Sequence, residues 1–296
     1  MRWLSVNVRE EHVPMASTTS DDWSPADNPY AIAVSEAQWW RNAALLAIKR
    51  MRADDDHIGW MSTRQIDARQ LIFALRQLLT AEQLEQVALA ELGIDPSVGD
   101  ALTAARQRFE DALPGVKHMR DGLMHFDEWS RGEGFGPQRV RRKAGELARD
   151  VARHYWSFGY DPTTGVVSFG PYSVHIDSAE QAAGQLCDDI YMAAREVDNK
   201  NTAARRARVV AALSIAGFVC DVPESPIQIS PGTDHKIWVS LRSHDDADLA
   251  ERVVFALAAD RLQLTPTMAA FEGTTIERLL RNEPLFVEPN ESPNDS

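Results

Sequence analysis

The segment Lys117–Trp129 is unusually dense in side chains that could do acid–base chemistry. On a helix, Asp121 and His125, four residues apart, would share a face, and His118 and His125, seven apart, would do the same. Arg120 would lie about 140° around such a helix from His125, and both can still border one cleft. Asp121 could hold His125 in one tautomer.

These residue types suit cleavage of an RNA phosphodiester. An imidazole can take a proton from a ribose 2′-hydroxyl or give one to the leaving oxygen. A guanidinium can hold the phosphate and stabilise the charge that develops on its oxygens. Neither step needs a metal or a cofactor.

The hexapeptide Arg120 to His125, Arg-Asp-Gly-Leu-Met-His, resembles the signature of the HEPN superfamily. Its members are helical bundles, and many are dimeric, metal-independent ribonucleases of toxin–antitoxin or phage-defence systems. The resemblance implies that Arg120 and His125 are catalytic, that Asp121 is the polar position after the arginine, and that a homodimer brings two motifs together. It covers only this hexapeptide and its helical setting, and other members are non-catalytic scaffolds.

Further cations could bind the substrate, and we predict this role for His118, Arg141, Arg142 and Lys143. A second basic group lies at Lys200, Arg205, Arg206 and Arg208. The competing interpretation of both basic groups is that each is a solvated helix face. For Arg120, Asp121 and His125, the competing interpretation is that they form ordinary surface ion pairs.

Composition excludes several classes of protein. A net charge of -13 over 296 residues argues against non-specific nucleic-acid binding, because an acidic surface repels phosphates. Cys187 and Cys220 are the only cysteines, which gives neither a disulfide framework nor a thiolate metal site. No apolar stretch is long enough to cross a bilayer and the N-terminus lacks an export pattern, so a cytoplasmic location without membrane contact is expected.

Helical periodicity predicts a mainly α fold, a multi-helix bundle over residues 31–198. The expected helices are 35–52, 62–79, 80–93, 96–113, 116–129, 138–154 and 178–197. Pro114-Gly115 and the glycines of residues 132–136 separate three of them. A β-hairpin is expected near 155–176, around the turn residues Asp161 to Gly165.

Beyond a boundary at Asp198–Thr202, residues 202–285 are expected to form a small α/β unit. Its elements would be a helix over 203–216, strands near 218–222, 236–241 and 262–264, and a helix over 247–260. Residues 1–30 are interpreted as a disordered leader and 286–296 as a disordered tail. The α/β unit over residues 202–285 would recruit substrate, a protein partner or a small ligand.

Two other functions compete with the ribonuclease. In the first, the bundle is a non-catalytic dimeric scaffold, and the α/β unit binds a protein or a small ligand. The second is a transcription-linked binding protein. The net negative charge of the chain and the lack of clear helix-turn-helix spacing both argue against it.

Overall fold

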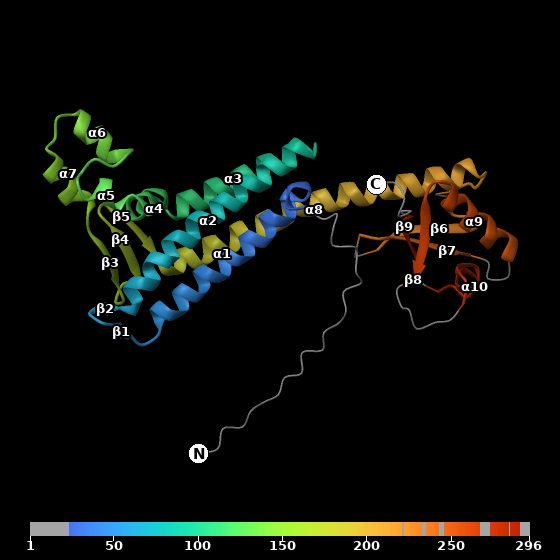
Figure 1. The fold of residues 1–296 in the computed structure, drawn as a ribbon, viewed down its shortest axis with the longest axis horizontal. Coiled ribbons are helices and arrows are strands. Elements are labelled where there is room, and N and C mark those ends of the chain that lie inside the picture. The colour runs from blue at the N-terminus through green and yellow to red at the C-terminus, as the bar shows by residue number, and fades with distance from the viewer. Residues whose placement is uncertain are drawn as a thin grey trace, which may run out of the picture.

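A computed structural model describes residues 24–220, 222–232, 235–242, 246–266, 273–283 and 285–290. The chain is mainly α, as predicted: an elongated helical bundle is followed by a small unit built on an antiparallel sheet (Figure 1). Most of the expected disordered leader lies outside the described residues. Its end is ordered, because Pro25–Asp27 form a 3-10 turn and the first long helix begins at Pro29.

Four long helices pack lengthwise to form the bundle: α1 (Pro29–Arg52), α2 (Thr63–Glu91), α3 (Pro96–Ala112) and the first half of α8 (Ile176–Ile215). Their buried residues recur at helical spacing, as Leu71, Leu75, Leu78 and Leu79 do in α2. The start of α3 is as predicted, because the Asp95 carboxylate accepts a hydrogen bond from the Ser97 amide and Pro96 occupies the first helical position.

Two predicted helix breaks are wrong. The helices expected over 62–79 and 80–93 are one helix, α2, because the Thr80 hydroxyl donates back to the Arg76 carbonyl at 3.5 Å instead of capping a new helix. The boundary expected at Asp198–Thr202 lies inside α8, which has no proline or glycine between residues 185 and 216. There the Thr202 hydroxyl donates to the Asp198 carbonyl at 2.7 Å, so this polar run stays helical.

Short elements cover one end of the bundle. They are α4 (Val116–Met124), α5 (Phe126–Trp129), α6 (Pro137–Lys143), α7 (Ala148–Tyr155) and a sheet of β3 (Phe158–Asp161), β4 (Val166–Phe169) and β5 (Tyr172–His175), while β1 (His57–Ile58) and β2 (Met61–Ser62) join α1 to α2. The helices predicted over 116–129 and 138–154 are therefore each interrupted. The second break falls near Gly145, whose φ of 90° is left-handed.

The predicted hairpin over 155–176 has a third strand. The segment expected as one strand after the first turn folds back at Gly170, so that β5 pairs with β4. Gly170 has a φ of 56°, and a Cβ there would lie 2.8 Å from the Tyr155 Cα, so only glycine fits this turn.

The C-terminal unit consists of β6 (Ile227–Pro231), β7 (Ile237–Leu241), α9 (Ala247–Ala259), β8 (Leu262–Pro266), α10 (Thr275–Leu280) and β9 (Leu285–Pro289). The strand order is β6-β7-β9-β8, all antiparallel. The unit packs on the second half of α8, where Val209 and Leu213 join its core (Figure 1).

Two expectations for this unit are wrong. Residues 286–290 belong to the fold, because β9 pairs with both β7 and β8 and buries Leu285 and Phe286, whereas 291–296 lie outside the described residues. In the segment expected as a strand near 218–222, residues 218–220 and 222 have no strand structure. Across the described ranges, no helix combines the length and the apolar character needed to cross a membrane.

Gly122 holds α4 close to the sheet. A Cβ at this position would lie 2.2 Å from Phe169 Cε1 and 3.0 Å from Trp129 Cε3, and both aromatic side chains are 1% exposed. We expect Gly122→Ala to lower the free energy of unfolding by about 1–3 kcal/mol, because a fully buried pair of rings has no room to move.

Gly184 is the matched control, since it also lies within a helix but a Cβ there would meet nothing within 4 Å. Gly184→Ala should raise the free energy of unfolding by up to about 1 kcal/mol through helix propensity. Urea unfolding measures both variants, and equal effects would contradict the close approach at Gly122.

Candidate ribonuclease site

The candidate site is built on α4 and its C-terminal end. Val116, Met119 and Gly122 form the buried face of this helix. Helical geometry ends at His125, with φ -108° and ψ 45°. The His125 amide still donates to the Asp121 carbonyl at 2.9 Å, while its carbonyl accepts from the Trp129 amide at 3.0 Å. His125 therefore joins two helices at a bend, and its side chain is exposed.

Arg120 and Asp121 form an ion pair with each other. The Arg120 Nη1 donates to the Asp121 Oδ1 at 2.9 Å, and the two side chains are 32% and 30% exposed. The pair is thus open to solvent on one side. The sequence predicts that Asp121 orients the His125 imidazole, whereas the described contact of its carboxylate is with the neighbouring guanidinium, and His125 has left the helical geometry.

A second guanidinium lies near this pair. Arg76 of α2 has its Nη1 atom buried, with no hydrogen-bond partner among the described residues. Burial lowers the pKa of Arg76, and the positive charge of Arg120 lowers it further, while Asp121 acts in the opposite direction. Since an arginine side chain stays protonated in proteins, this buried nitrogen would be satisfied by an anion.

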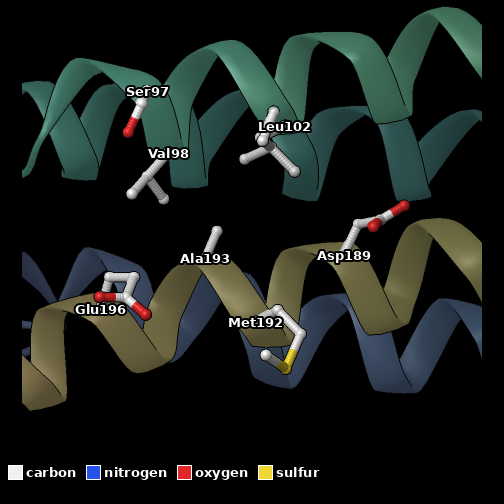
Figure 2. Close-up of a pocket in the computed structure, with 8 residues that line it drawn as sticks. Ser97, Val98, Leu102, Asp189, Met192, Ala193 and Glu196 are labelled. Atoms are coloured by element: carbon white, nitrogen blue, oxygen red, sulfur yellow. The ribbon is translucent and has the colours of Figure 1, made fainter.

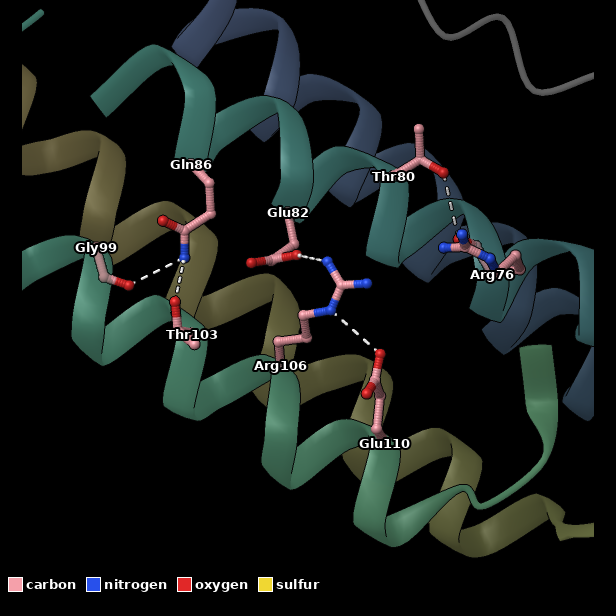
Figure 3. Close-up of polar contacts among 8 residues, drawn as sticks. All are labelled: Arg76, Thr80, Glu82, Gln86, Gly99, Thr103, Arg106 and Glu110. Carbon is pink, nitrogen blue, oxygen red and sulfur yellow. Dashed lines mark hydrogen bonds and ion pairs between the residues drawn. The ribbon is translucent and has the colours of Figure 1, made fainter. Parts of the chain in front are cut away.

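A third arginine pairs with two acids (Figure 3). Arg106 of α3 pairs with Glu82 of α2 at 2.9 Å and with Glu110, one turn further along its own helix, at 3.1 Å. Burial raises the pKa of Glu82, which is 1% exposed, and the charge of Arg106 opposes that rise. Arg106 thus stabilises the contact between α2 and α3, whereas the neighbouring Arg76 keeps one nitrogen without a hydrogen-bond partner among the described residues.

Three of the four predicted substrate-binding residues have partners of their own among the described contacts. His118 stacks on Tyr172 with ring centroids 5.0 Å apart, and burial lowers the pKa of this imidazole. Arg141 pairs with Glu146, and Arg142 donates to the Glu146 carbonyl, so both stabilise the loop between α6 and α7. Lys143 is exposed. His118, Arg141 and Arg142 therefore have structural contacts that the sequence did not predict.

A groove between α3 and α8 does not suit a phosphate (Figure 2). Its volume is about 300 Å³, and it is lined by apolar side chains such as Val98 and Met192 together with the carboxylates of Asp189 and Glu196. Neither Arg120 nor His125 lines it. The acids would repel an RNA backbone, so this groove is not the candidate site.

Arg76 is the residue that analysis of the sequence missed, although a signal for it exists. It follows Ile72 by four residues and precedes Leu79 by three, so a charged side chain stands close to the apolar stripe of α2. A lone arginine in such a stripe needs an anionic partner.

With an exposed imidazole and two neighbouring guanidiniums, one of them short of a partner, the site can bind a phosphate and transfer protons. Comparisons with models of protein families, with curated proteins and with solved structures found no match to this chain.

Proposed function

We propose that this protein is a metal-independent RNA endonuclease of the HEPN type, acting in the cytoplasm in a toxin or defence role. Arg120 and Arg76 hold the scissile phosphate. The His125 imidazole takes the proton from the ribose 2′-hydroxyl, which attacks the adjacent phosphorus and expels the 5′-oxygen of the next nucleotide, and the imidazolium then returns the proton to that leaving oxygen. The products of this step are a 2′,3′-cyclic phosphate and a free 5′-hydroxyl.

The observation that supports this proposal most is the unpartnered Arg76 nitrogen next to the Arg120–Asp121 pair. A buried guanidinium nitrogen without a hydrogen-bond partner is costly, and a phosphate oxygen would satisfy it. The exposed His125 at the end of the same short helix supplies an acid–base group that no other side chain of the protein engages among the described contacts.

A homodimer is part of the proposal. Met124 and Phe126 flank His125 in the chain and are 51% and 60% exposed, which leaves apolar surface beside the imidazole. A second copy covering this surface would narrow the open site and bring a second pair of arginines toward the first imidazole.

The test is incubation of a single-stranded RNA with the purified protein in excess chelator. We expect cleavage with 2′,3′-cyclic phosphate ends, and no cleavage of DNA of the same sequence, because DNA has no 2′-hydroxyl. Arg76→Gln should weaken RNA binding about tenfold through loss of one charge-assisted contact. Arg149→Gln, at an exposed position on α7, is the control that should leave binding unchanged.

If purified protein leaves RNA intact and binds it no better than Arg76→Gln does, the nuclease proposal is wrong. The second candidate, a non-catalytic dimeric scaffold, would then be favoured. The Arg120–Asp121 pair is compatible with that function, since an ion pair at a surface needs no substrate.

A further inference from the structure

The short helix α6 is anchored to the end of the bundle by a buried side chain. Gln138 is 0% exposed, its Oε1 accepts a hydrogen bond from the Gly134 amide at 2.8 Å, and its Nε2 donates to the Trp129 carbonyl at 3.0 Å. Figure 1 shows α6 at the end of the bundle that lies away from the C-terminal unit. Because Gln138 faces inward, the opposite side of α6 faces solvent.

That opposite side combines positive charge with apolar surface. At about 100° per residue, Arg139, Val140 and Lys143 lie between about 100° and 200° around the helix from Gln138. All three are exposed, and Val140 is 67% exposed. The Arg139 guanidinium also lies over the ring of Phe135, 5.5 Å from its centroid. Arg139, Val140 and Lys143 are called the outer face of α6 below.

The charge around α6 is opposite to that of the chain as a whole. Residues 135–156 contain six Lys or Arg and two Asp or Glu, whereas the full sequence has 31 and 44. A surface that is both basic and apolar suits an acidic protein surface with apolar side chains, because aliphatic groups gain little from contact with a phosphate backbone. The body of a second copy of this chain offers an acidic surface of that kind.

The groove between α3 and α8 has the complementary pattern (Figure 2). Asp189, Met192 and Glu196 are spaced by three and four residues, so they lie along one side of α8. Figure 2 shows the two acids at opposite ends of the groove, with Met192 and Ala193 between them. Met192 is 55% exposed, and Val98 lines the wall that α3 provides. The groove therefore has an apolar middle and a carboxylate at each end.

Glu196 is the more available of these two acids. Its Oε1 accepts a hydrogen bond from the Asn199 amide at 3.3 Å, and this donor is neutral. Asp189, in contrast, already pairs with the Arg108 guanidinium at 2.9 Å. A cation that entered the groove would thus meet, at Glu196, a carboxylate whose charge is not offset by an ion pair among the described contacts.

We propose that the outer face of α6 of one copy docks in the α3–α8 groove of a second copy. Within one chain the two surfaces lie apart, because the groove is at the start of α3 whereas α4 follows its end. Val140 enters the apolar middle of the groove beside Met192, and the cations of α6 lie next to Glu196. This head-to-tail contact uses a different surface of each copy, so it is separate from the two-fold contact proposed at Met124 and Phe126 and does not depend on ribonuclease activity.

The test is disulfide cross-linking between two purified full-length variants, Val140→Cys and Met192→Cys. Both carry Cys220→Ser, which leaves the buried Cys187 as the one other thiol. The measured product is the peptide pair that contains both new cysteines. It should form at least about tenfold faster than the corresponding pair from Val140→Cys and Ile215→Cys, because docking raises the effective concentration of the two thiols. Ile215 is the matched control, since it is an exposed apolar residue of α8 outside the groove lining.

Charge reversal tests the complementarity directly. Arg139→Glu with Lys143→Glu, in the chain with the new cysteine on α6, should slow the cross-link at least about tenfold, because like charges then meet in the groove. Glu196→Lys in the other chain should do the same, and combining the two sets of changes should restore most of the rate. Arg149→Glu with Arg153→Glu makes the same charge change at exposed positions of α7 and should have a much smaller effect.

Equal cross-linking rates with the groove cysteine and the control cysteine would overturn the proposal. Rates that do not respond to charge reversal on either side would also overturn it. So would a result in which Arg139→Glu with Lys143→Glu weakens RNA binding and leaves the cross-linking rate unchanged, because the outer face of α6 would then be an RNA contact.

Discussion

His125→Ala is expected to lower the rate of RNA cleavage by about 10²–10⁴-fold, the usual contribution of a general acid–base group. Arg120→Ala should produce a loss of about 10²-fold or more, since it removes stabilisation of the charge that develops on the phosphate. Arg120→Lys should restore only part of the activity, because an ammonium lacks the planar fork that binds two phosphate oxygens. The measurement is the single-turnover rate on one RNA, with chelator present.

Folding can be separated from chemistry in these variants. His125 is exposed and Arg120 is partly exposed, so neither substitution should change the free energy of unfolding by more than about 1 kcal/mol. His57→Ala, which changes an exposed histidine of β1, is the control that should retain full activity. Equal cleavage by wild type and His125→Ala would show that this imidazole does not take part in the reaction.

The second large effect concerns Glu85, which lies within the bundle and takes no part in the proposed chemistry. Its side chain is 0% exposed, and both carboxylate oxygens have no hydrogen-bond partner in the described part of the chain. Burial, together with the negative charge of Asp198, raises the pKa of Glu85 from 4.5 to about 8. The native protein therefore binds a proton here at neutral pH that the unfolded chain releases.

The sign of the pH dependence follows from this difference. The favourable contribution of the neutral carboxyl is fully present below pH 4.5 and is lost as the pH rises through 8. We expect the free energy of unfolding to fall by at most about 1.4 kcal/mol per pH unit in this window, or about 4 kcal/mol between pH 5 and 8. Burial also raises the pKa values of Asp67 and Glu82, which add to the decline, whereas the lowered pKa of His118 opposes it.

Glu85→Gln isolates the contribution of this one carboxyl, since an amide stays neutral at every pH in the window. Urea unfolding at pH 5, 6, 7 and 8 should give a much flatter profile for Glu85→Gln than for wild type, with the largest gain in stability at pH 8. Glu91→Gln, at an exposed position of the same helix, should reproduce the wild-type slope. Parallel profiles for wild type and Glu85→Gln would contradict a proton held by Glu85.

Local patterns account for much of what could be predicted. The mainly α class and the start of α3 follow from helical periodicity and from the Asp95–Pro96 cap, which act over a few residues. In the C-terminal unit, β7 and α9 also lie where their alternating and helical patterns predict them. Chemical reactivity is local as well, so Arg120, Asp121 and His125 could be singled out as a candidate site before their positions were known.

Contacts between residues far apart in the sequence determine the features that could not be predicted. Whether Asp121 pairs with Arg120 or with His125 depends on where α4 ends, and that end is constrained by the packing of Gly122 against Phe169 and Trp129. The sequence likewise determined that Arg76 is charged, and only the packing of α2 near α4 buried one nitrogen of its guanidinium near Arg120 without a hydrogen-bond partner among the described residues. The helical period determines on which face of a helix a side chain lies. Which residue it contacts there depends on the volume and charge of residues far away in the sequence.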